Sequence, residues 1–303
     1  MEYQDYLLVV IIGTLMGTIT RLVLLHVDYR QYPGYPHGYI VHLSLGFIAS
    51  ALGAVAVPAI VEKEFTAFTF LALAAQQFRE IRHQERTTLE SLEDSEIIQR
   101  GSDYIEGIAR TFEARNYLVM ASAFTTALAT LIGLSSGAGV IPGLTIGILT
   151  LVTSWLYRKG RVIGDICDVK VAKIHFNGPT LMVENVGLIN VGLKERRDKI
   201  LKEGLAVMIH PKNDNARATI HDMGQRMVIA HTAGVVLGTK KDIDIPDYTP
   251  ILRKDVDTGS VAMYMMPMER DAKALVEAVK RSPVLESAYS KPLATKAGRY
   301  ASD

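Results

Sequence analysis

The chain has 303 residues, with 33 Lys and Arg against 32 Asp and Glu, which gives a formal net charge of +1. A nucleic-acid-binding protein usually carries a clear basic excess, so this balance argues against that class. The single cysteine, Cys167, excludes a disulfide framework and a multi-cysteine zinc or iron–sulfur centre. We expect no metal site and no cofactor.

The charges are unevenly distributed along a chain that is 49% hydrophobic and has a mean hydropathy of +0.17. Only 12 of the basic and 14 of the acidic residues lie in the first 161 positions. The first part therefore predicts a helical transmembrane domain over 1–161. The charged remainder predicts a soluble domain over 162–290.

Two candidate spans occur early, at Tyr6–Val27 and Gly38–Val61, and they contain Arg21 and His42. Intramembrane charge is costly, so Arg21 should face protein or water, or extend to the nearer interface. His42 could face the interior of the bundle. Phe65–Ala75 is apolar over only 11 residues, which fits a short span or a re-entrant segment.

The longest uncharged stretch runs over 41 residues, Tyr117–Tyr157. Since about 20 residues cross the hydrocarbon core, it predicts two spans joined by a Ser-Gly turn. Gly13-xxx-Gly17 and Gly143-xxx-Gly147 would let helices approach closely, and this spacing favours internal packing over dimerisation.

A basic cluster, Arg158 to Arg161, follows the last span and should remain in the cytoplasm. We expect a multi-pass protein of the cell membrane, with five spans and the N-terminus outside, or four spans and the N-terminus inside. The acidic N-terminal segment lacks the features of a cleaved signal peptide and should remain as an anchor.

A polar stretch, Gln76–Asn116, separates the apolar segments, and a helix over 102–116 is predicted within it. Asp103 followed by Glu106 has the spacing of a capping box. The apolar residues of this helix recur at helical spacing and should be buried; they are Tyr104, Ile105, Ile108 and Phe112.

Glu106 and Arg110 on the same helix have the i,i+4 spacing of a surface ion pair. With Tyr104, they are our candidate binding or coupling residues.

The six residues Tyr104 to Ala109 spell the hexapeptide that names the YIEGIA family, and the order of apolar and charged regions also agrees. The chain thus resembles membrane proteins of endospore-forming bacteria of about this length. The resemblance implies a role in sporulation and points toward a membrane-anchored protease. It supplies no catalytic residues.

The second half reads as a cytoplasmic α+β domain. Two β-branched runs, Asp168–Phe176 and Thr180–Gly192, are joined by Asn177-Gly178-Pro179, a strong hairpin signal. A charged helix, Lys194–Glu203, and an apolar strand, Leu205–His210, follow.

A weak repeat relates Ala206–Ala218 to Ala262–Ala274, each an apolar strand, a proline and an Ala-containing helix. Two such units would pack on one sheet, as in ferredoxin-like or related folds. The sequence therefore predicts a membrane α-helical domain of four to five spans followed by a cytoplasmic α+β domain, with a duplicated strand–helix unit if the repeat is real. Lys240–Asp257 should be a long loop and 291–303 a flexible tail.

Asp257 to Ser260 match the Asp-Thr-Gly-Ser signature of aspartic proteases. Those enzymes share one proton between two aspartates, so a chain with one copy would have to act as a homodimer. The competing interpretation is a turn residue, because few residues remain after the motif to build the rest of such a lobe.

Asp165 and Asp168 are further acidic candidates, just after the last span. The competing interpretation for both is a polar linker. Ser135 in a Gly-x-Ser-x-Gly pattern is better read as a helix–helix turn. Cys167 could be a nucleophile, but no sequence feature places a histidine beside it. His210, His221 and His231 lack metal-ligand spacing.

Two hypotheses therefore remain: a membrane-anchored protease acting on a protein substrate, or a non-enzymatic membrane adaptor that binds a protein partner. Transport is a weaker third alternative, since the spans contain few polar residues.

Overall fold

The computed structural model describes residues 3–28, 36–93, 96, 98–157, 160–240 and 250–289. The chain divides into two compact units. The helical unit comprises 1–87 and 108–160, and the α/β unit comprises 88–107 and 161–303. The tail 291–303, most of the loop after Lys240 and the basic residues Arg158 and Lys159 lie outside the described residues.

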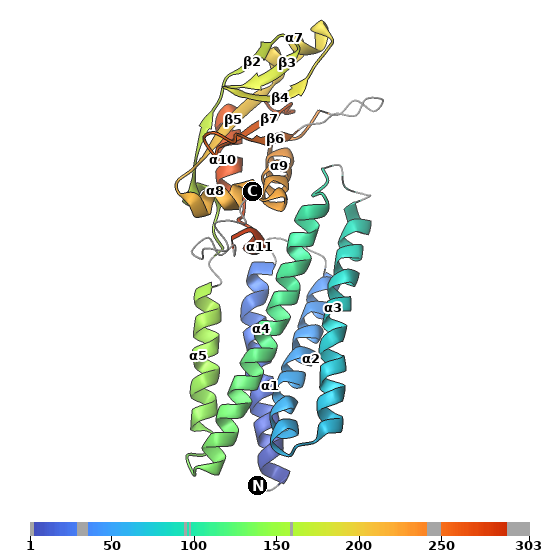
Figure 1. Ribbon diagram of the computed structural model, residues 1–303, viewed down its shortest axis with the longest axis vertical. Coiled ribbons are helices and arrows are strands. Elements are labelled where there is room, and N and C mark those ends of the chain that lie inside the picture. Colours follow the sequence, from blue (N-terminus) through green and yellow to red (C-terminus); the bar gives the residue numbers. More distant parts are fainter. Residues whose placement is uncertain are drawn as a thin grey trace. The chain divides into compact units, whose positions relative to one another are not determined.

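The helical region contains five helices within its described residues (Figure 1). They are α1 (Tyr3–Asp28), α2 (Pro36–Val61), α3 (Phe65–Glu93), α4 (Ser102–Ser135) and α5 (Ile141–Tyr157).

Three of these helices, α1, α2 and α4, are long and apolar enough to cross a membrane, and α5 is a shorter apolar helix. This composition suggests association with a membrane. The predicted short span Phe65–Ala75 does not exist as a separate element. It is the start of the 29-residue α3, which is not among the candidate spans because its second half is strongly polar.

The helical unit exposes apolar side chains and buries polar ones. Leu15 on α1 is 56% exposed and Ile148 on α5 is 56% exposed, whereas Arg21, Ser50 and Thr126 are fully buried. A water-soluble bundle has the opposite arrangement. The outer surface of the helical unit is therefore suited to lipid contact.

The glycine pairs of the spans serve contacts within the helical unit. A Cβ added at Gly13 would lie 2.9 Å from the carbonyl oxygen of Ala123, and one added at Gly143 would lie 1.9 Å from Thr130 Oγ1. These close approaches agree with internal packing, the favoured interpretation of the sequence.

The α/β unit is built on a four-stranded antiparallel sheet in the order β1-β5-β7-β6 and a three-stranded antiparallel sheet in the order β2-β3-β4. Its strands are β1 (Cys167–Val171), β2 (Ile174–Asn177), β3 (Thr180–Val183), β4 (Val186–Asn190), β5 (Leu205–Pro211), β6 (Ile251–Lys254) and β7 (Val261–Met265). Its helices after the spans are α6 (Ile163–Ile166), α7 (Lys194–Glu203), α8 (Asp214–His221), α9 (Met223–Leu237), α10 (Ala272–Arg281) and α11 (Glu286–Tyr289).

Two apolar layers hold the unit together, because successive strand residues point to opposite faces of the larger sheet. Val207 and Ile209 belong to the layer shared with α8, α9 and α10. Ala206 and Met208 belong to the layer shared with the three-stranded sheet. The order is helices, larger sheet, smaller sheet (Figure 1).

The predicted hairpin at Asn177-Gly178-Pro179 is confirmed, since Asn177 pairs with Thr180 in antiparallel register and Gly178 has φ +59°. Each predicted run, however, forms two strands. The first divides between the two sheets, and the second turns at Glu184, which has φ +47°.

The two repeated segments lie in one sheet, as expected, with β5 and β7 as antiparallel neighbours. The predicted long loop over Lys240–Asp257 is wrong in its last part, where β6 pairs with β7.

Candidate functional site

Asp257 lies in the turn between β6 and β7, and its side chain is exposed. The neighbouring Asp255 organises this turn: its carboxylate accepts hydrogen bonds from Thr258 Oγ1 at 2.6 Å and from the Asp257 backbone N at 3.2 Å. Gly259 closes the turn with φ +70°. This is the arrangement in which aspartate normally stabilises turns.

The other two acidic candidates lie in separate environments. Asp165 in α6 accepts a hydrogen bond from Val162 N at 3.1 Å. Asp168 on β1 is 3.9 Å from Lys212 Nζ, and its side chain is 65% exposed. Within the described part of the chain, no hydrogen bond or ion pair joins any two of Asp165, Asp168 and Asp257. Their catalytic role remains a prediction.

Two further nucleophile candidates are poorly placed for chemistry. Cys167 is buried, and burial raises the pKa of its thiol to about 12, with Lys212 opposing the shift. A thiolate is the reactive form, so burial disfavours a nucleophilic role for this group. Ser135 lies at the end of α4, where its hydroxyl donates to the Ile132 carbonyl oxygen at 3.0 Å. This supports the turn interpretation.

A cleft of about 350 Å³ opens in the α/β unit between the larger sheet and the β3–β4 turn. Polar and apolar groups both line it, and the lining consists of Lys170, Val171, Glu184, Asn185, Val186, Met208, His210, Asp255 and Thr258. Strand alternation explains the composition: Lys170 faces Met208, and Asp168 faces His210, across the β1–β5 pair.

His210 contributes an imidazole ring to this cleft. The sequence predicted no functional role for it, because it lacks metal-ligand spacing. Its Nδ1 lies 2.9 Å from Ser260 Oγ. Ser260 is only 2% exposed and is not a lining residue, so its hydroxyl orients the ring. No described residue hydrogen-bonds Nε2. The Asp-Thr-Gly-Ser motif is the sequence signal for this place. Its serine, rather than its aspartate, contacts the histidine.

A second histidine supports the same turn from the helix side. His221 Nε2 lies 2.9 Å from the carbonyl oxygen of Gly259. Burial lowers the pKa of His221, while the bond to Gly259 opposes the shift. The neutral ring must therefore carry its proton on Nε2 to donate to this carbonyl.

The hexapeptide Tyr104 to Ala109 begins at the third residue of α4, within its first turn. Tyr104 and Ile105 are 4% and 2% exposed, so the predicted burial of this apolar face is confirmed. Tyr104 makes an edge contact with His231 of α9, with ring centroids 5.9 Å apart. Asp103 lies in the first turn, because α4 begins at Ser102.

The glycine of the hexapeptide, Gly107, lies where a side chain would be crowded. A Cβ added at Gly107 would lie 3.1 Å from Leu285 Cδ1 and 3.1 Å from Ser287 Oγ, next to α11. Glu106 is half-buried and Arg110 is exposed. Their predicted pairing remains untested.

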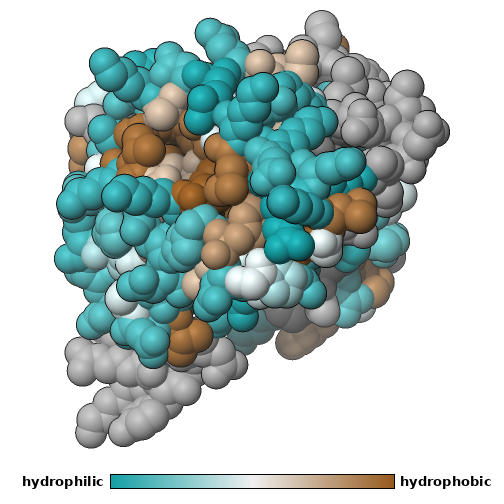
Figure 2. Space-filling model, turned by 90° about the horizontal axis from the view of Figure 1, so that it is seen from above, coloured by the Kyte–Doolittle hydropathy of each residue, from teal (hydrophilic) through white to brown (hydrophobic). Residues whose placement is uncertain are grey.

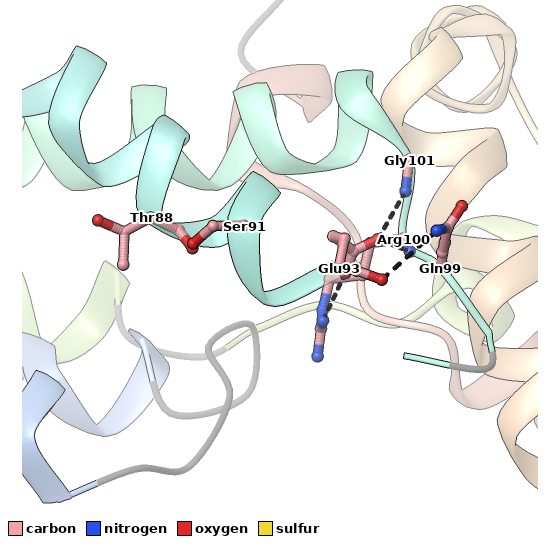
Figure 3. Close-up of polar contacts among 6 residues, drawn as sticks. All are labelled: Thr88, Ser91, Glu93, Gln99, Arg100 and Gly101. Atoms are coloured by element: carbon pink, nitrogen blue, oxygen red, sulfur yellow. Dashed lines mark hydrogen bonds and ion pairs between the residues drawn. The ribbon is translucent and has the colours of Figure 1, made fainter. Parts of the chain in front are cut away.

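A buried carboxylate fixes the segment that leads into the hexapeptide (Figure 3). Glu93 at the end of α3 is 6% exposed. It accepts from the backbone N of Arg100, from Arg100 Nη1 at 2.7 Å and from the Gly101 N at 3.3 Å. These charge-assisted bonds close the α3–α4 connection and set the start of α4.

The YIEGIA profile, described as YIEGIA protein, matches residues 9–295. The chain belongs to the YIEGIA family. It is also 42% identical over 289 residues to "Uncharacterized protein YphB" of Bacillus subtilis (strain 168), covering 95% of this chain and 96% of that protein. No solved structure matches the chain. The resemblance read from Tyr104 to Ala109 is thereby confirmed over nearly the whole length.

Proposed function

We propose that this chain is an integral membrane protein that acts in sporulation and engages a protein through its α/β unit on the cytoplasmic side. The exposed apolar surface of the helical unit supports membrane insertion. The YIEGIA relative from Bacillus subtilis, an endospore-forming bacterium, supports the sporulation role.

The observation that carries the protein-binding part is the open cleft around His210. It combines apolar side chains with a cationic group, carboxylates and an imidazole, and binding sites use such a few placed polar groups among apolar ones to orient what they bind. The face seen in Figure 2 is mostly hydrophilic, with apolar side chains gathered in a limited area. We favour an adaptor or scaffold, because Asp257 lies in an exposed turn that Asp255 organises, as a turn aspartate does.

Cross-linking from the cleft tests the binding. A photoreactive residue at Asn185, at the β3–β4 turn, should cross-link one protein in sporulating cells. The same residue at Lys273 on α10, outside the cleft lining, serves as the control. Adding His210→Ala should weaken the Asn185 product. Equal products from both positions would contradict the proposal.

A reporter fusion tests the sidedness. A C-terminal reporter that is active only in the cytoplasm should give signal, because the basic residues after α5 favour the inside. Activity of a reporter that works only outside would contradict the topology.

Proteolysis is the second candidate, favoured by the 2.9 Å contact between His210 and Ser260. Oriented by that hydroxyl, His210 could serve as a general base beside the cleft. In the aspartic alternative, a homodimer would instead bring two Asp257 side chains together.

Matched variants separate these mechanisms. Asp257→Asn should leave processing of a substrate unchanged, because asparagine favours the same turns. His210→Gln should lower processing if the imidazole is the base. Loss of processing in Asp257→Asn at normal protein levels would instead establish the aspartic mechanism. If the wild-type protein processes no candidate substrate, the adaptor hypothesis is favoured.

A further inference from the structure

β1 is an edge strand of the larger sheet, with β5 on one side and, within the part of the chain that the structure describes, no strand on the other. Cys167 and Val169 of this strand are buried. Asp168, Lys170 and Val171 are exposed. Because strand residues alternate between faces, the acidic and the basic side chain lie on one face, two positions apart. We call the outer side of β1 the free edge.

The hydrogen bonds to β5 determine which backbone groups point toward the free edge. Ala172, which follows β1, donates from its N to the Ala206 carbonyl oxygen at 2.9 Å. Antiparallel strands alternate between residue pairs that exchange both hydrogen bonds and pairs that exchange none. The even-numbered residues of β1 are therefore bonded to β5, and the odd-numbered ones direct their N–H and C=O groups outward. The pairing of Cys167 with Pro211, which has no N–H, agrees with this pattern.

The free edge offers backbone donors and acceptors to a further strand. No described residue forms a backbone hydrogen bond there with Val169 or Val171. The Cys167 N–H is bonded to the Ile163 carbonyl oxygen of α6, which leaves the Cys167 carbonyl oxygen as an acceptor. A row of such groups is a template for pairing with another chain.

Charge selects a second copy of this chain as the occupant. Two β1 strands can pair in antiparallel register about a two-fold axis at Val169. Asp168 of each copy then lies opposite Lys170 of the other, and opposite charges placed directly across a strand pair are stabilising. Val169 lies opposite itself, so the outward N–H of each copy meets the outward C=O of the other. The free edge is therefore complementary to itself in hydrogen bonding and in charge.

The opposite edge of the same sheet lacks this complementarity. β6 ends in Arg253 and Lys254 and contains no acidic residue, so two β6 strands would bring only cations together. On β1, Lys170 has no ion-pair partner within the described ranges, and the partner of Asp168 is Lys212, with N and O 3.9 Å apart. The charges of β1 are therefore available to a second copy.

We propose that two copies of this chain pair through β1 into a two-fold symmetric dimer, in which the two larger sheets form one continuous antiparallel sheet. Val169 exchanges both backbone hydrogen bonds with Val169 of the second copy, and Val171 N donates to the Cys167 carbonyl oxygen of that copy. Lys170 and Val171 also line the cleft, so the pairing brings the two clefts next to each other on one face of the joined sheet. The dimer does not depend on the protein partner proposed above.

Charge exchange between full-length copies tests the dimer. A five-residue strand pair is a small interface, so the association should be reversible. Energy transfer between donor-labelled and acceptor-labelled copies in detergent micelles measures it at equilibrium. Asp168→Lys in all copies, or Lys170→Asp in all copies, should raise the dissociation constant by about tenfold, because like charges then face each other at both positions.

The mixed pair is the decisive arm. Donor copies with Asp168→Lys and acceptor copies with Lys170→Asp should associate as the wild type does, because every facing pair is again of opposite charge. Recovery in this pair also shows that both variants are folded. Lys199→Asp is the matched control: it makes the same charge change on α7, which contacts β2, and should leave association unchanged.

Absence of energy transfer between wild-type copies, or equal transfer in the single variants, would overturn the proposal. Loss in both single variants without recovery in the mixed pair would assign the free edge to a different partner and would overturn the proposal too. If the charge variants do not accumulate, Val171→Pro decides. It removes an outward N–H, which edge strands tolerate, and should abolish association; association equal to that of the wild type would overturn the dimer.

Discussion

Several contacts between the first turn of α4 and α9 require the absence of a side chain. Gly224, in the first turn of α9, is one such position: an added Cβ would lie 2.7 Å from the carbonyl oxygen of Asp103. Gly101 is similar, since its Cβ would lie 2.8 Å from Met227 Sδ. A backbone carbonyl cannot rotate away as a methionine can, so a side chain at Gly224 would force a backbone shift, whereas Gly101 is restricted mainly by its φ of +87°.

Gly224→Ala should therefore lower the free energy of unfolding of the α/β unit. Overpacking typically costs about 1–3 kcal/mol, offset by up to about 1 kcal/mol that alanine gains over glycine in a helix. Denaturant unfolding of the full chain measures the difference. Gly192→Ala is the control, because nothing lies within 4 Å of its added Cβ. Similar unfolding curves for both variants would show that α4 and α9 are not in close contact.

Two half-buried histidines predict acid sensitivity of the α/β unit. Burial lowers the pKa of both His221 and His231. The unfolded chain, with histidine pKa values near about 6.5, therefore binds more protons than the folded chain as the pH falls below that value. Their contribution to stability is present above this pH and is lost as the pH falls toward the folded pKa values.

We expect the unfolding free energy of the α/β unit to fall between pH 7.5 and pH 5.5. In the variant His221→Gln with His231→Gln the fall should be smaller, because glutamine does not titrate. His175→Gln, which replaces a strand histidine of the smaller sheet, controls for loss of a histidine alone. An equal fall in all three proteins would rule out this linkage.

At the scale of elements, the helices α3 and α4 continue across changes in hydropathy. α3 joins the apolar Phe65–Ala75 to a charged segment, and α4 joins the motif helix to the following span in 34 residues. Helical hydrogen bonds do not depend on whether a residue faces lipid, protein or water. The changes in hydropathy therefore predicted helix ends at positions where the helices continue.

The sequence predicted those features that depend on local pattern. The apolar runs indicated the candidate spans, Gly178 indicated the β2–β3 turn, and spacing indicated the buried face of Tyr104 and Ile105. The contacts of His210 with Ser260 and of His42 with Glu85 join residues far apart in the chain. Single-sequence periodicity contains no information on such pairs.

Ile108→Asp tests the packing of α4 itself. Ile108 is fully buried, so an aspartate there would be an unpaired carboxylate and should lower the unfolding free energy by about 3–5 kcal/mol. Accumulation in membranes and thermal unfolding measure the effect. Ala114→Asp, at an exposed position of the same helix, introduces the same group and should be tolerated better. Normal accumulation and stability of Ile108→Asp would refute the buried position.

At the scale of the whole molecule, the α/β unit is assembled from two separate chain segments, 88–107 and 161–303. Segment 88–107 supplies Ile98, and a Cβ added at Gly234 would lie 3.1 Å from its Cγ2. The same segment supplies Tyr104, which contacts His231. The soluble-looking C-terminal half is therefore incomplete without the segment that contains the hexapeptide.

A fragment of 161–303 should be less stable than the same unit in the full chain, because its α9 face loses the cover of 88–107. Adding a peptide of residues 96–110 should raise its thermal unfolding temperature. The same peptide with Tyr104→Asp, which places a carboxylate in an apolar contact, should not. A fragment that is as stable as the intact unit and indifferent to the peptide would show that 161–303 folds independently.

The two-segment construction also orders the events of biosynthesis. Residues 88–107 leave the ribosome first, followed by α4 and α5, and only then by the strands and by α9 and α11, which pack on that first segment. More than a hundred further residues are synthesised before the packing partners of this segment are available. Folding of the α/β unit is therefore completed only after the last apolar helix has been made, so every candidate span is synthesised before the chain has a finished globular domain.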